Sequence, residues 1–447
     1  MGTKLPAGMR SFLQSEFVRE YGMVFVLLLL CVYFSARTIK PQHPTGEGAG
    51  RQVAADILRQ HDAPNVIIVA GTTDADQAFA ESLKQAVETA GGTVLATVNG
   101  QPRDAVQAID AALAAGKTVE AIGQTDVTSK WGLFNTRYPQ FPEQTYFKPN
   151  PYLWPNFLKV SNLLSVADQT AIYAIIGIGM TMVIVTAGID LSIGSLIALA
   201  SVTAAVFIRD YGGGKEATVL MMIAGCALGI GICALSGAFV GTVVTAFRVP
   251  PFIVTLAMMM IASGLAFSLS EGKPIDAVPA SIKWLGGSRT LGVHNTVWLT
   301  VALYGVASVV MSRTVFGRHI YAIGGNEEAA KLSGIRIGRV LIIVYAICGG
   351  LAGLGGILLT SRHTGSNPTF GALAELEVIA AVVVGGTSLM GGRGRIFGTL
   401  IGAFIIAVIK NGMNMTGVEP FSQKIVLGAV LLGAVLLDTL KRRGLKV

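Results

Sequence analysis

The chain has 447 residues, of which 52% are hydrophobic and only 13% are charged. Soluble domains contain about 25% charged residues, so this composition argues against a chain built from several water-soluble domains. The 55 glycines and the net charge of +8 are typical of a polytopic membrane protein, in which small residues let helices pack closely and basic residues flank the spans. We therefore interpret the positive charge as a topology signal and expect the lipid bilayer, not nucleic acid, as the partner.

The first long apolar run covers residues 21–36 and follows the basic residues Lys4, Arg10 and Arg19. A cleaved signal peptide is the competing interpretation, but the charged leader is long and no clear A-x-A cleavage site follows. We expect residues 1–40 to form a cytoplasmic N-terminus and a retained first transmembrane helix.

Residues 41–150 have the character of a small soluble domain with linkers. The prolines and glycines between 41 and 50 predict a linker. Strands then alternate with amphipathic helices, at residues 65–70, 75–90, 93–98, 103–115 and 119–122. This alternation is typical of βαβ units and a parallel sheet, so we expect a small α/β domain between the first two spans.

The sequence does not predict a site for a nucleotide or a metal. Gly116-Lys117-Thr118 lacks the earlier glycine of a phosphate-binding loop, because position 111 is alanine, and it follows a helix instead of preceding one. The four cysteines lie in apolar runs with no CxxC pair and no Cys/His cluster. We therefore expect no catalytic residues, no metal and no cofactor in this chain.

Apolar runs dominate residues 151–447 and predict a transmembrane domain. Together with the first run they make ten spans, the other nine lying near 166–187, 191–208, 217–246, 250–270, 296–311, 340–361, 376–390, 395–411 and 424–438. Several runs are shorter than the ~20 residues of a simple span, as expected for broken helices. Basic residues favour a topology with both termini in the cytoplasm and residues 41–150 outside. The expected fold class is a polytopic α-helical membrane protein of about ten transmembrane helices with a small inserted α/β domain.

Polar residues near the spans are candidates for contact with a substrate. Asp190 precedes a predicted helix, where its carboxylate is either an N-cap or a substrate contact. Thr181 and Thr186 either line a path or bond to the backbone of their own helix.

Two loops carry further motifs. The segment at 312–339 contains a helix start at Asn326 and a stop at Gly334, and it is either a solvated connector or a docking surface for a cytoplasmic partner. At 384–395, glycines surround Thr387 and Ser388 and predict a broken helix or a re-entrant turn at the cytoplasmic face.

Three motifs together resemble one family. They are PNFL at 155–158 with AGIDLSIGS at 187–195, GGNEEAAKLSGI at 324–335, and GGTSLMGGRGR at 385–395. In this order they resemble the permease subunits of ribose-type ABC importers, over about residues 155–440. The resemblance implies two permease copies in a bacterial-type inner membrane, a cytoplasmic ABC ATPase that binds ATP and Mg²⁺, and an external sugar-binding protein.

The resemblance also implies roles for single residues. The segment that couples to the ATPase would comprise Gly325, Asn326, Glu327, Glu328, Ala329, Ala330 and Gly334. Candidates for the family motif or the path are Gly188, Asp190, Ser192, Gly194, Thr181, Thr186, Thr387 and Ser388. The chain would translocate a monosaccharide such as ribose, or a related small polar solute, and supply no bond chemistry.

The segment 41–150 departs from this family, whose members pass through a short loop here. It resembles the first lobe of a periplasmic sugar-binding protein, but only about half a lobe is present. Docking of the soluble binding protein, shielding of the cavity mouth and absence of a function stay open as alternatives.

Other transport classes are also considered. Import of branched-chain amino acids is the alternative within the same superfamily, and an ATP-independent channel, a secondary transporter or a membrane-anchored sensor are the others. A secondary carrier is disfavoured because its spans would be expected to hold ionisable residues, and here almost none lie away from the span ends. A sensor is disfavoured because no cytoplasmic output domain is evident. The sequence does not identify the sugar.

Overall fold

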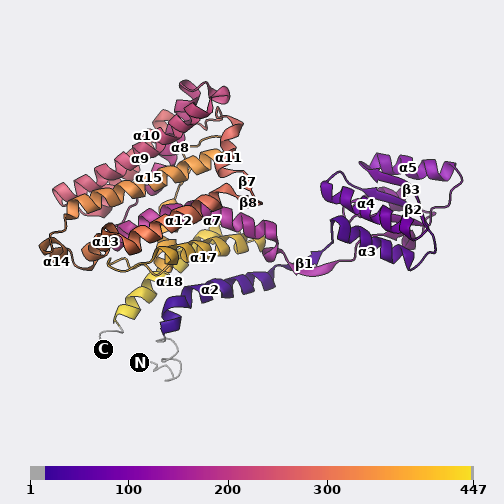
Figure 1. Ribbon diagram of the computed structural model, residues 1–447, viewed down its shortest axis with the longest axis horizontal. Helices are drawn as coiled ribbons and strands as arrows, with labels where there is room; N and C mark the ends of the chain where they lie inside the picture. The colour runs from indigo at the N-terminus through magenta and orange to yellow at the C-terminus, as the bar shows by residue number, and fades with distance from the viewer. Residues whose placement is uncertain (1–15, 444–447) are drawn as a thin grey trace, which may run out of the picture. The chain divides into compact units, whose positions relative to one another are not determined.

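The computed structural model describes residues 16–443 and contains two compact units, both drawn in Figure 1. The α/β unit runs from Ile39 to Asn156. The helical unit comprises the chain up to Thr38 and from Phe157 onward. The predicted basic leader around Lys4 and Arg10 lies outside the described residues.

The α/β unit is built on a four-stranded parallel sheet in the order β3-β2-β4-β5. Its strands are β2 (Asn65–Ala70), β3 (Thr93–Asn99), β4 (Ala121–Gln124) and β5 (Tyr146–Phe147). The run NVIIVA of β2 is apolar throughout because helices cover both faces of the sheet. Val66 and Ile68 pack with α3 (Gly46–Leu58) and α4 (Asp74–Thr89), whereas Ile67 and Val69 pack with α5 (Pro102–Ala114).

The expected elements between 65 and 115 are present, but two other expectations need correction. The third strand begins two residues later than predicted, at Ala121. Residues 46–50 do not form a linker, because they lie in the first turns of α3. Gly50 allows α3 to approach α4 closely, since a Cβ at this position would lie only 2.4 Å from the Phe79 carbonyl oxygen.

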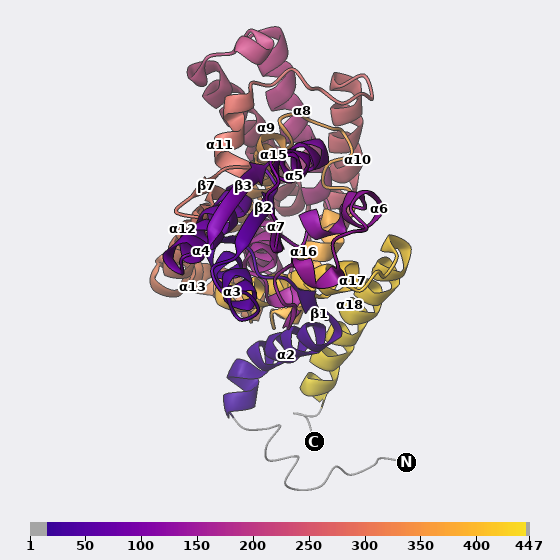
Figure 2. The ribbon, with the colours of Figure 1, turned by 90° about the vertical axis from the view of Figure 1, so that its right-hand side faces the viewer.

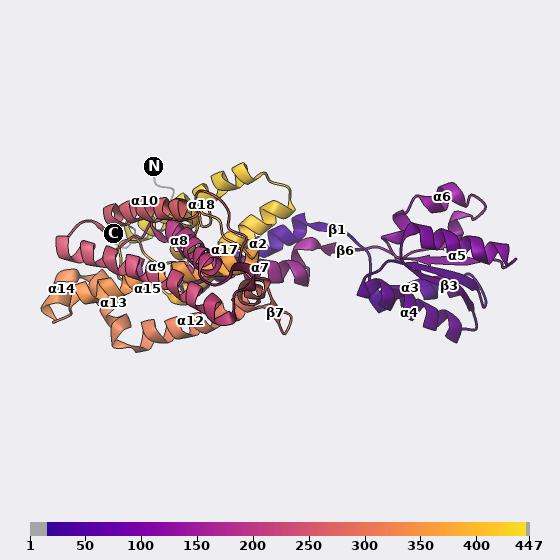
Figure 3. The same ribbon diagram turned by 90° about the horizontal axis from the view of Figure 1, so that it is seen from above.

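The two ends of the α/β unit lie side by side. β1 (Ile39–Gln42) pairs antiparallel with β6 (Tyr152–Pro155), as Figure 3 shows. The aromatic and proline-rich stretch before β6 contains α6 (Leu133–Arg137) and β5. Thr38 and Phe157, the residues of the helical unit next to these two strands, are also in contact. The Phe157 N–H donates to Thr38 Oγ1 at 3.1 Å.

In the helical unit, a helix occupies each of the ten predicted spans. They are α2 (Glu16–Arg37), α7 (Val160–Val185), α8 (Ile193–Asp210), α9 (Val219–Phe247), α10 (Pro251–Leu269), α12 (Asn295–Arg313), α15 (Ile337–His363), α16 (Ala374–Val384), α17 (Ile396–Met415) and α18 (Pro420–Arg443). Within the described part of the chain, seven of these helices are long and apolar enough to cross a membrane. The apolar parts of α2 and α18 are shorter, and α16 has only 11 residues.

Small residues determine how these helices pack. The α9 stripe of Gly225, Gly229, Cys233, Gly237 and Gly241 is buried, and α9 packs against α15 and α8. A Cβ at Gly237 would lie 2.1 Å from the Tyr345 carbonyl oxygen, and one at Gly349 would lie 2.2 Å from the Cys233 carbonyl oxygen. The backbones of α9 and α15 therefore approach as closely as glycine permits. Figure 2 shows α9 and α10 on the opposite side of the helical unit from α2 and α18.

The connections gather at two ends of the helical unit. The short helices α13 (Val315–Gly325) and α14 (Glu327–Leu332) lie at one end, and the first turn of α2 and the last turn of α18 lie toward the same end (Figures 1 and 3). Helix α11 (Lys283–Gly286) and the β7–β8 hairpin (Arg289–Thr290 and Val293–His294) lie at the other end. A chain that begins and ends toward the same end of the unit is expected when an even number of segments crosses the unit.

Candidate functional site

The α13–α14 segment forms an exposed projection. The Thr314 hydroxyl caps α13 by accepting from the Gly317 N–H, and the Asn326 side chain caps α14 by accepting from the Ala329 N–H at 3.0 Å. In α14 only Ala330 is buried, whereas Leu332 is 89% exposed. Leu332 and the charged Glu327, Glu328 and Lys331 are exposed on α14, the segment that the sequence predicts as a docking surface for a cytoplasmic partner.

Three segments that are far apart in the sequence meet beneath this projection, and we call their contact the three-segment junction. They are the end of α7, the Gly324 turn of α13, and the loop 385–395. A Cβ at Gly324 would lie 1.7 Å from the Val185 carbonyl oxygen and 2.5 Å from the Gly392 nitrogen. The Gly392 N–H donates to that same carbonyl at 2.8 Å. The backbone of α13 is therefore in close contact with both α7 and the loop.

A side-chain hydrogen bond fixes the same junction. The Tyr321 hydroxyl of α13 donates to the Gly394 carbonyl oxygen at 2.7 Å. Burial raises the pKa of this hydroxyl above its usual value. Within the loop, the Ser388 N–H donates to the Arg393 carbonyl oxygen at 3.0 Å and closes the turn. The loop is thus a compact turn between α16 and α17.

A cavity of about 660 Å³ opens next to α14. Its walls come from the α7–α8 connection, the α9–α10 junction, α14 and the start of α15. The polar lining consists of Thr186, Thr245, Arg248, Glu327, Lys331, Arg336 and Tyr345. A cavity of this size, with polar groups at its rim, is large enough for a small solute.

Asp190 is buried near this cavity. Its Oδ1 accepts from the Ser192 N–H at 2.9 Å and from the Ser192 hydroxyl at 2.6 Å. Ser192, and not Asp190, is the N-cap residue of α8. Among the described residues, neither Asp190 Oδ2 nor the buried Tyr345 hydroxyl has a hydrogen-bond partner.

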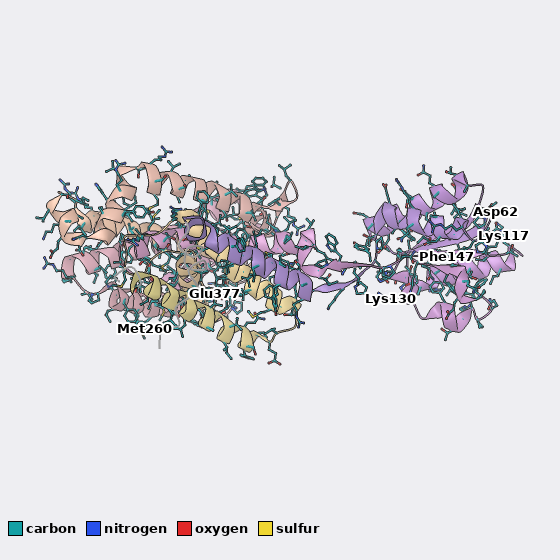
Figure 4. All side chains as sticks on the ribbon, turned by 90° about the horizontal axis from the view of Figure 1, so that it is seen from below. Asp62, Lys117, Lys130, Phe147, Met260 and Glu377 are labelled. Carbon is teal, nitrogen blue, oxygen red and sulfur yellow. The ribbon has the colours of Figure 1, made fainter. Side chains whose placement is uncertain are left out.

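A polar cluster, consisting of Asp168, Arg362, Glu377 and Lys410, lies closer to the opposite end of the helical unit. Arg362 of α15 pairs with Asp168 of α7 at 2.9 Å, and Lys410 of α17 contacts both carboxylate oxygens of Glu377 of α16 at 2.9 Å. Figure 4 labels Glu377 among the helices. Two salt bridges therefore link four helices.

A small cavity lies between these ion pairs. It has a volume of about 160 Å³ and is lined by Gln169, Tyr173, Arg362, Gly371 and Lys410, among others. The Lys410 ammonium lies 5.6 Å from the centre of the Tyr173 ring. Hydrogen-bonding groups and an aromatic face thus surround one compact space inside an otherwise apolar bundle.

Comparisons with known proteins identify the helical unit. Residues 162–435 match the family described as "Branched-chain amino acid transport system / permease component". This match covers more than half of the chain. The chain belongs to this permease family.

The permease also has curated relatives. It is 44% identical over 294 residues to the ribose import permease protein of Escherichia coli. These aligned residues make up 65% of this chain and 89% of the relative. It is 37% identical over 292 residues to the fructose import permease protein of Rhizobium meliloti (63% and 79%) and 36% identical over 289 residues to the L-arabinose transport system permease protein of Escherichia coli (65% and 86%). No solved structure matches the chain.

The residues predicted as path candidates occupy different places in the permease. The Thr181 hydroxyl bonds to the Gly177 carbonyl oxygen of its own helix and to the Thr399 hydroxyl, both at 2.6 Å. The Thr186 hydroxyl donates to its own helix, although Thr186 also lines the larger cavity. The Thr387 hydroxyl is buried without a hydrogen-bond partner among the described residues.

Gly188 and Gly194 have tight surroundings. A Cβ at Gly188 would lie 2.5 Å from the Tyr345 hydroxyl, and one at Gly194 would lie 2.2 Å from Glu375 Oε2. Both glycines therefore allow a polar side chain of another helix to approach the α7–α8 connection. These two contacts are the only structural roles that we assign to them.

The four residues of the polar cluster lie at or near the ends of the predicted spans, and their pairing is what the sequence did not show. Arg362 lies just beyond the predicted span 340–361 and Lys410 near the end of the predicted span 395–411, where basic residues ordinarily mark topology. A carboxylate such as Glu377 within an apolar run is the sequence signal that points to such a cluster. Its partner, however, lies on another helix, and the sequence alone does not reveal that pairing. Residues 16–443 contain no group of His, Cys, Asp and Glu that could hold a metal ion.

Proposed function

We propose that the chain is the membrane-spanning permease subunit of an ATP-driven ABC importer and that it carries a monosaccharide or a related small polar solute. The family match over 162–435 carries this proposal, together with the substrates in the names of the three relatives, all of which are sugars. The family description favours branched-chain amino acids as the second candidate.

The proposed partners follow from the two ends of the helical unit. A cytoplasmic ABC ATPase, which binds ATP and Mg²⁺, docks on α14 and its exposed residues Glu327, Glu328 and Leu332. A second permease copy and an external binding protein complete the importer. In this arrangement both termini are cytoplasmic, because α2 begins and α18 ends toward the α14 end (Figure 1).

The three-segment junction would transmit the movement of the ATPase. Closure of the ATPase displaces α14 and α13, and the tight contact at Gly324 passes this displacement to the end of α7 and to the loop 385–395. The connection after α7 and α14 itself line the cavity of about 660 Å³, so its opening to the cytoplasm would change. The chain itself makes and breaks no covalent bond.

The polar cluster would line the path nearer the external side. Gln169, Tyr173 and the paired charges of Arg362 and Lys410 offer hydrogen bonds to the hydroxyl groups of a sugar. Because Asp168 and Glu377 balance the two cations, the lining suits a neutral solute.

The decisive experiment is uptake by reconstituted vesicles that contain the permease, its ATPase and its binding protein. Labelled ribose, fructose and arabinose are compared with labelled leucine, and ATP-dependent uptake of one of the sugars is expected. Uptake of leucine alone would select the amino-acid function, and uptake of a sugar without ATP would contradict an ABC importer.

The docking role of α14 has its own test. Reversing two charges in Glu327→Lys/Glu328→Lys should reduce uptake at least tenfold and uncouple ATP hydrolysis from it, because α14 no longer matches the ATPase surface. The control is Glu216→Lys/Glu271→Lys, which makes the same change at two exposed residues in other connections. Equal activity of the two variants would contradict the assignment of α14.

A further inference from the structure

The α/β unit contains a crevice of about 390 Å³, which is within the range of about 300–1,000 Å³ for small-molecule sites. Three segments line it: residues 41–46 from the end of β1 to the start of α3, the first turns of α4, and residues 125–130 after β4. Ala49 and the buried Phe79 form an apolar floor. The family match begins only at residue 162, so the crevice belongs to a part of the chain that this family does not describe.

The crevice lies where the strand order of the sheet reverses. From β2 the chain moves to β3 on one side, and the following strand, β4, lies on the other side of β2. Val69 near the end of β2 is paired with Gln124 at the end of β4, so the carboxyl ends of both strands open at the same edge. Ligands of open α/β sheets bind outside the carboxyl ends at such a reversal. Figure 4 shows Lys130 at this edge and Asp62 and Lys117 at the opposite one.

Hydrogen bonds hold the crevice wall in place. The Thr128 hydroxyl donates to the Val69 carbonyl oxygen at 2.8 Å, and the Thr125 N–H donates to Thr128 Oγ1 at 3.0 Å. These buried bonds fix the turn that carries Thr125, Asp126 and Lys130. The polar groups on this turn are therefore pre-organised for binding.

Acceptors and donors alternate around the crevice. Asp126 Oδ1 lies 3.2 Å from His43 Nε2, and Asp126 Oδ2 lies 2.7 Å from Lys130 Nζ. Asp76 supplies a second carboxylate from the first turn of α4. Asp76 Oδ2 also accepts from the Thr73 hydroxyl at 2.7 Å, whereas Asp126 is partly exposed and Lys130 is 70% exposed at the crevice.

The start of α3 adds backbone donors. Thr45 is the N-cap residue, but its side chain makes no capping hydrogen bond, so the first-turn N–H groups lack this usual partner. Gly46, the first residue of α3, has a φ of +67°, and a Cβ there would meet no atom within 4 Å. Both residues line the crevice, so the start of α3 borders it.

This set of groups identifies the chemical class of the ligand. Two carboxylates face one lysine and one histidine, so the side chains of the crevice offer no net positive charge to a phosphate or carboxylate ligand. The hydroxyl groups of a ligand both donate and accept hydrogen bonds. A ligand rich in hydroxyl groups therefore suits a crevice that has both donors and acceptors above an apolar floor. We propose that the crevice binds an uncharged monosaccharide or a similar polyhydroxylated molecule. The permease thus has a solute site in the α/β unit as well as a path, and only the choice of test sugars rests on the proposed function.

Hydrogen exchange of the full-length permease in detergent tests the proposal locally. D-ribose, D-fructose and L-arabinose are titrated, and at least one should slow the exchange of amides in 41–46 and 125–130. The variant Asp126→Ala/Lys130→Ala should need at least tenfold more sugar for the same protection. The milder variant Asp126→Asn keeps the size of the side chain and should also weaken protection, and unchanged exchange of residues 65–70 reports that the sheet remains folded.

The matched control is Lys84→Ala/Glu88→Ala, which removes another exposed pair of a lysine and an acid spaced four residues apart, on α4. It should bind sugar like the wild type. Protection confined to the helical unit, equal loss in both double variants, or stronger protection by a phosphorylated sugar than by the free one would each overturn the proposal. If vesicle uptake fails but sugar still protects the crevice amides, only the importer proposal is refuted. The two proposals can therefore fail separately.

Discussion

The paired charges of the polar cluster are energetically interdependent. Glu377 and Lys410 are linked by two contacts of 2.9 Å, and about a quarter of the Glu377 side chain and a third of the Lys410 side chain are exposed. Removing one member of a buried pair leaves the other charge in a poorly solvated place, whereas removing both need not destabilise the fold. The pair therefore acts as one unit in stability.

A double-mutant cycle measures this interdependence. Lys410→Met should lower the stability of the permease by about 1–3 kcal/mol, less than for a fully buried pair because solvent screens the exposed fraction. Glu377→Gln/Lys410→Met should recover most of this loss in thermal unfolding in detergent. The exposed pair Glu271–Lys273, 3.9 Å apart, is the control and should show no coupling. A double variant no more stable than Lys410→Met would contradict the interpretation.

At the scale of elements, the contact between α9 and α15 depends on the absence of side chains. Gly237→Ala would place a methyl group 2.1 Å from the Tyr345 carbonyl oxygen, so the helices must separate. We expect a fall in unfolding temperature and in membrane yield. Gly231→Ala on the same helix meets no atom within 4 Å and should be neutral or stabilising by up to about 1 kcal/mol. Similar effects of the two substitutions would show that helix propensity, and not packing against α15, determines how alanine at these positions changes stability.

The three-segment junction allows the same comparison in a functional assay. Gly324→Ala forces α13 away from the Val185 carbonyl oxygen, which a Cβ would approach to 1.7 Å, whereas a Cβ at the neighbouring Gly325 meets nothing within 4 Å. Gly324→Ala should therefore reduce sugar uptake at least tenfold relative to ATP hydrolysis, and Gly325→Ala should remain close to wild type. The ratio of transported sugar to hydrolysed ATP is the measurement, and an unchanged ratio in Gly324→Ala would contradict transmission through this contact.

The elements also show what can be predicted from sequence. Apolar length located every helix of the bundle, and glycines spaced by four residues on α9 indicated its packing face. Helix α3 was missed because its glycines resemble a linker, although Gly50 is needed for contact with α4. The polar cluster was missed for another reason. Asp168 and Arg362 are 194 residues apart, and only the folded bundle brings them together.

For the whole molecule, the α/β unit and the helical unit are separate compact bodies connected at Thr38 and Phe157. Each unit has hydrophobic core clusters of its own. The helical unit should therefore fold without residues 39–156. The two units would contribute differently to transport, the helical unit as the path and the α/β unit as a site that holds solute.

Replacing residues 39–156 with a short glycine-serine linker tests this division. We expect normal insertion and an unfolding temperature of the helical unit close to that of the full chain. Uptake should fall at low external sugar but not at saturating sugar, because only a binding site is removed. Loss of insertion would contradict independent folding, and unchanged uptake at every sugar concentration would show that the α/β unit does not contribute to transport.

The hydrogen bond between Phe157 and Thr38 has an evolutionary consequence. Because the chain leaves and re-enters the bundle at adjacent points, a foreign domain grafted here requires no rearrangement of the spans. The entropy of closing a longer loop rises by only about 0.6 kcal/mol for each doubling of its length. A transporter with two such adjacent chain ends can gain or exchange an accessory domain in one genetic step. The same position offers engineers a place to attach a fluorescent reporter of transport.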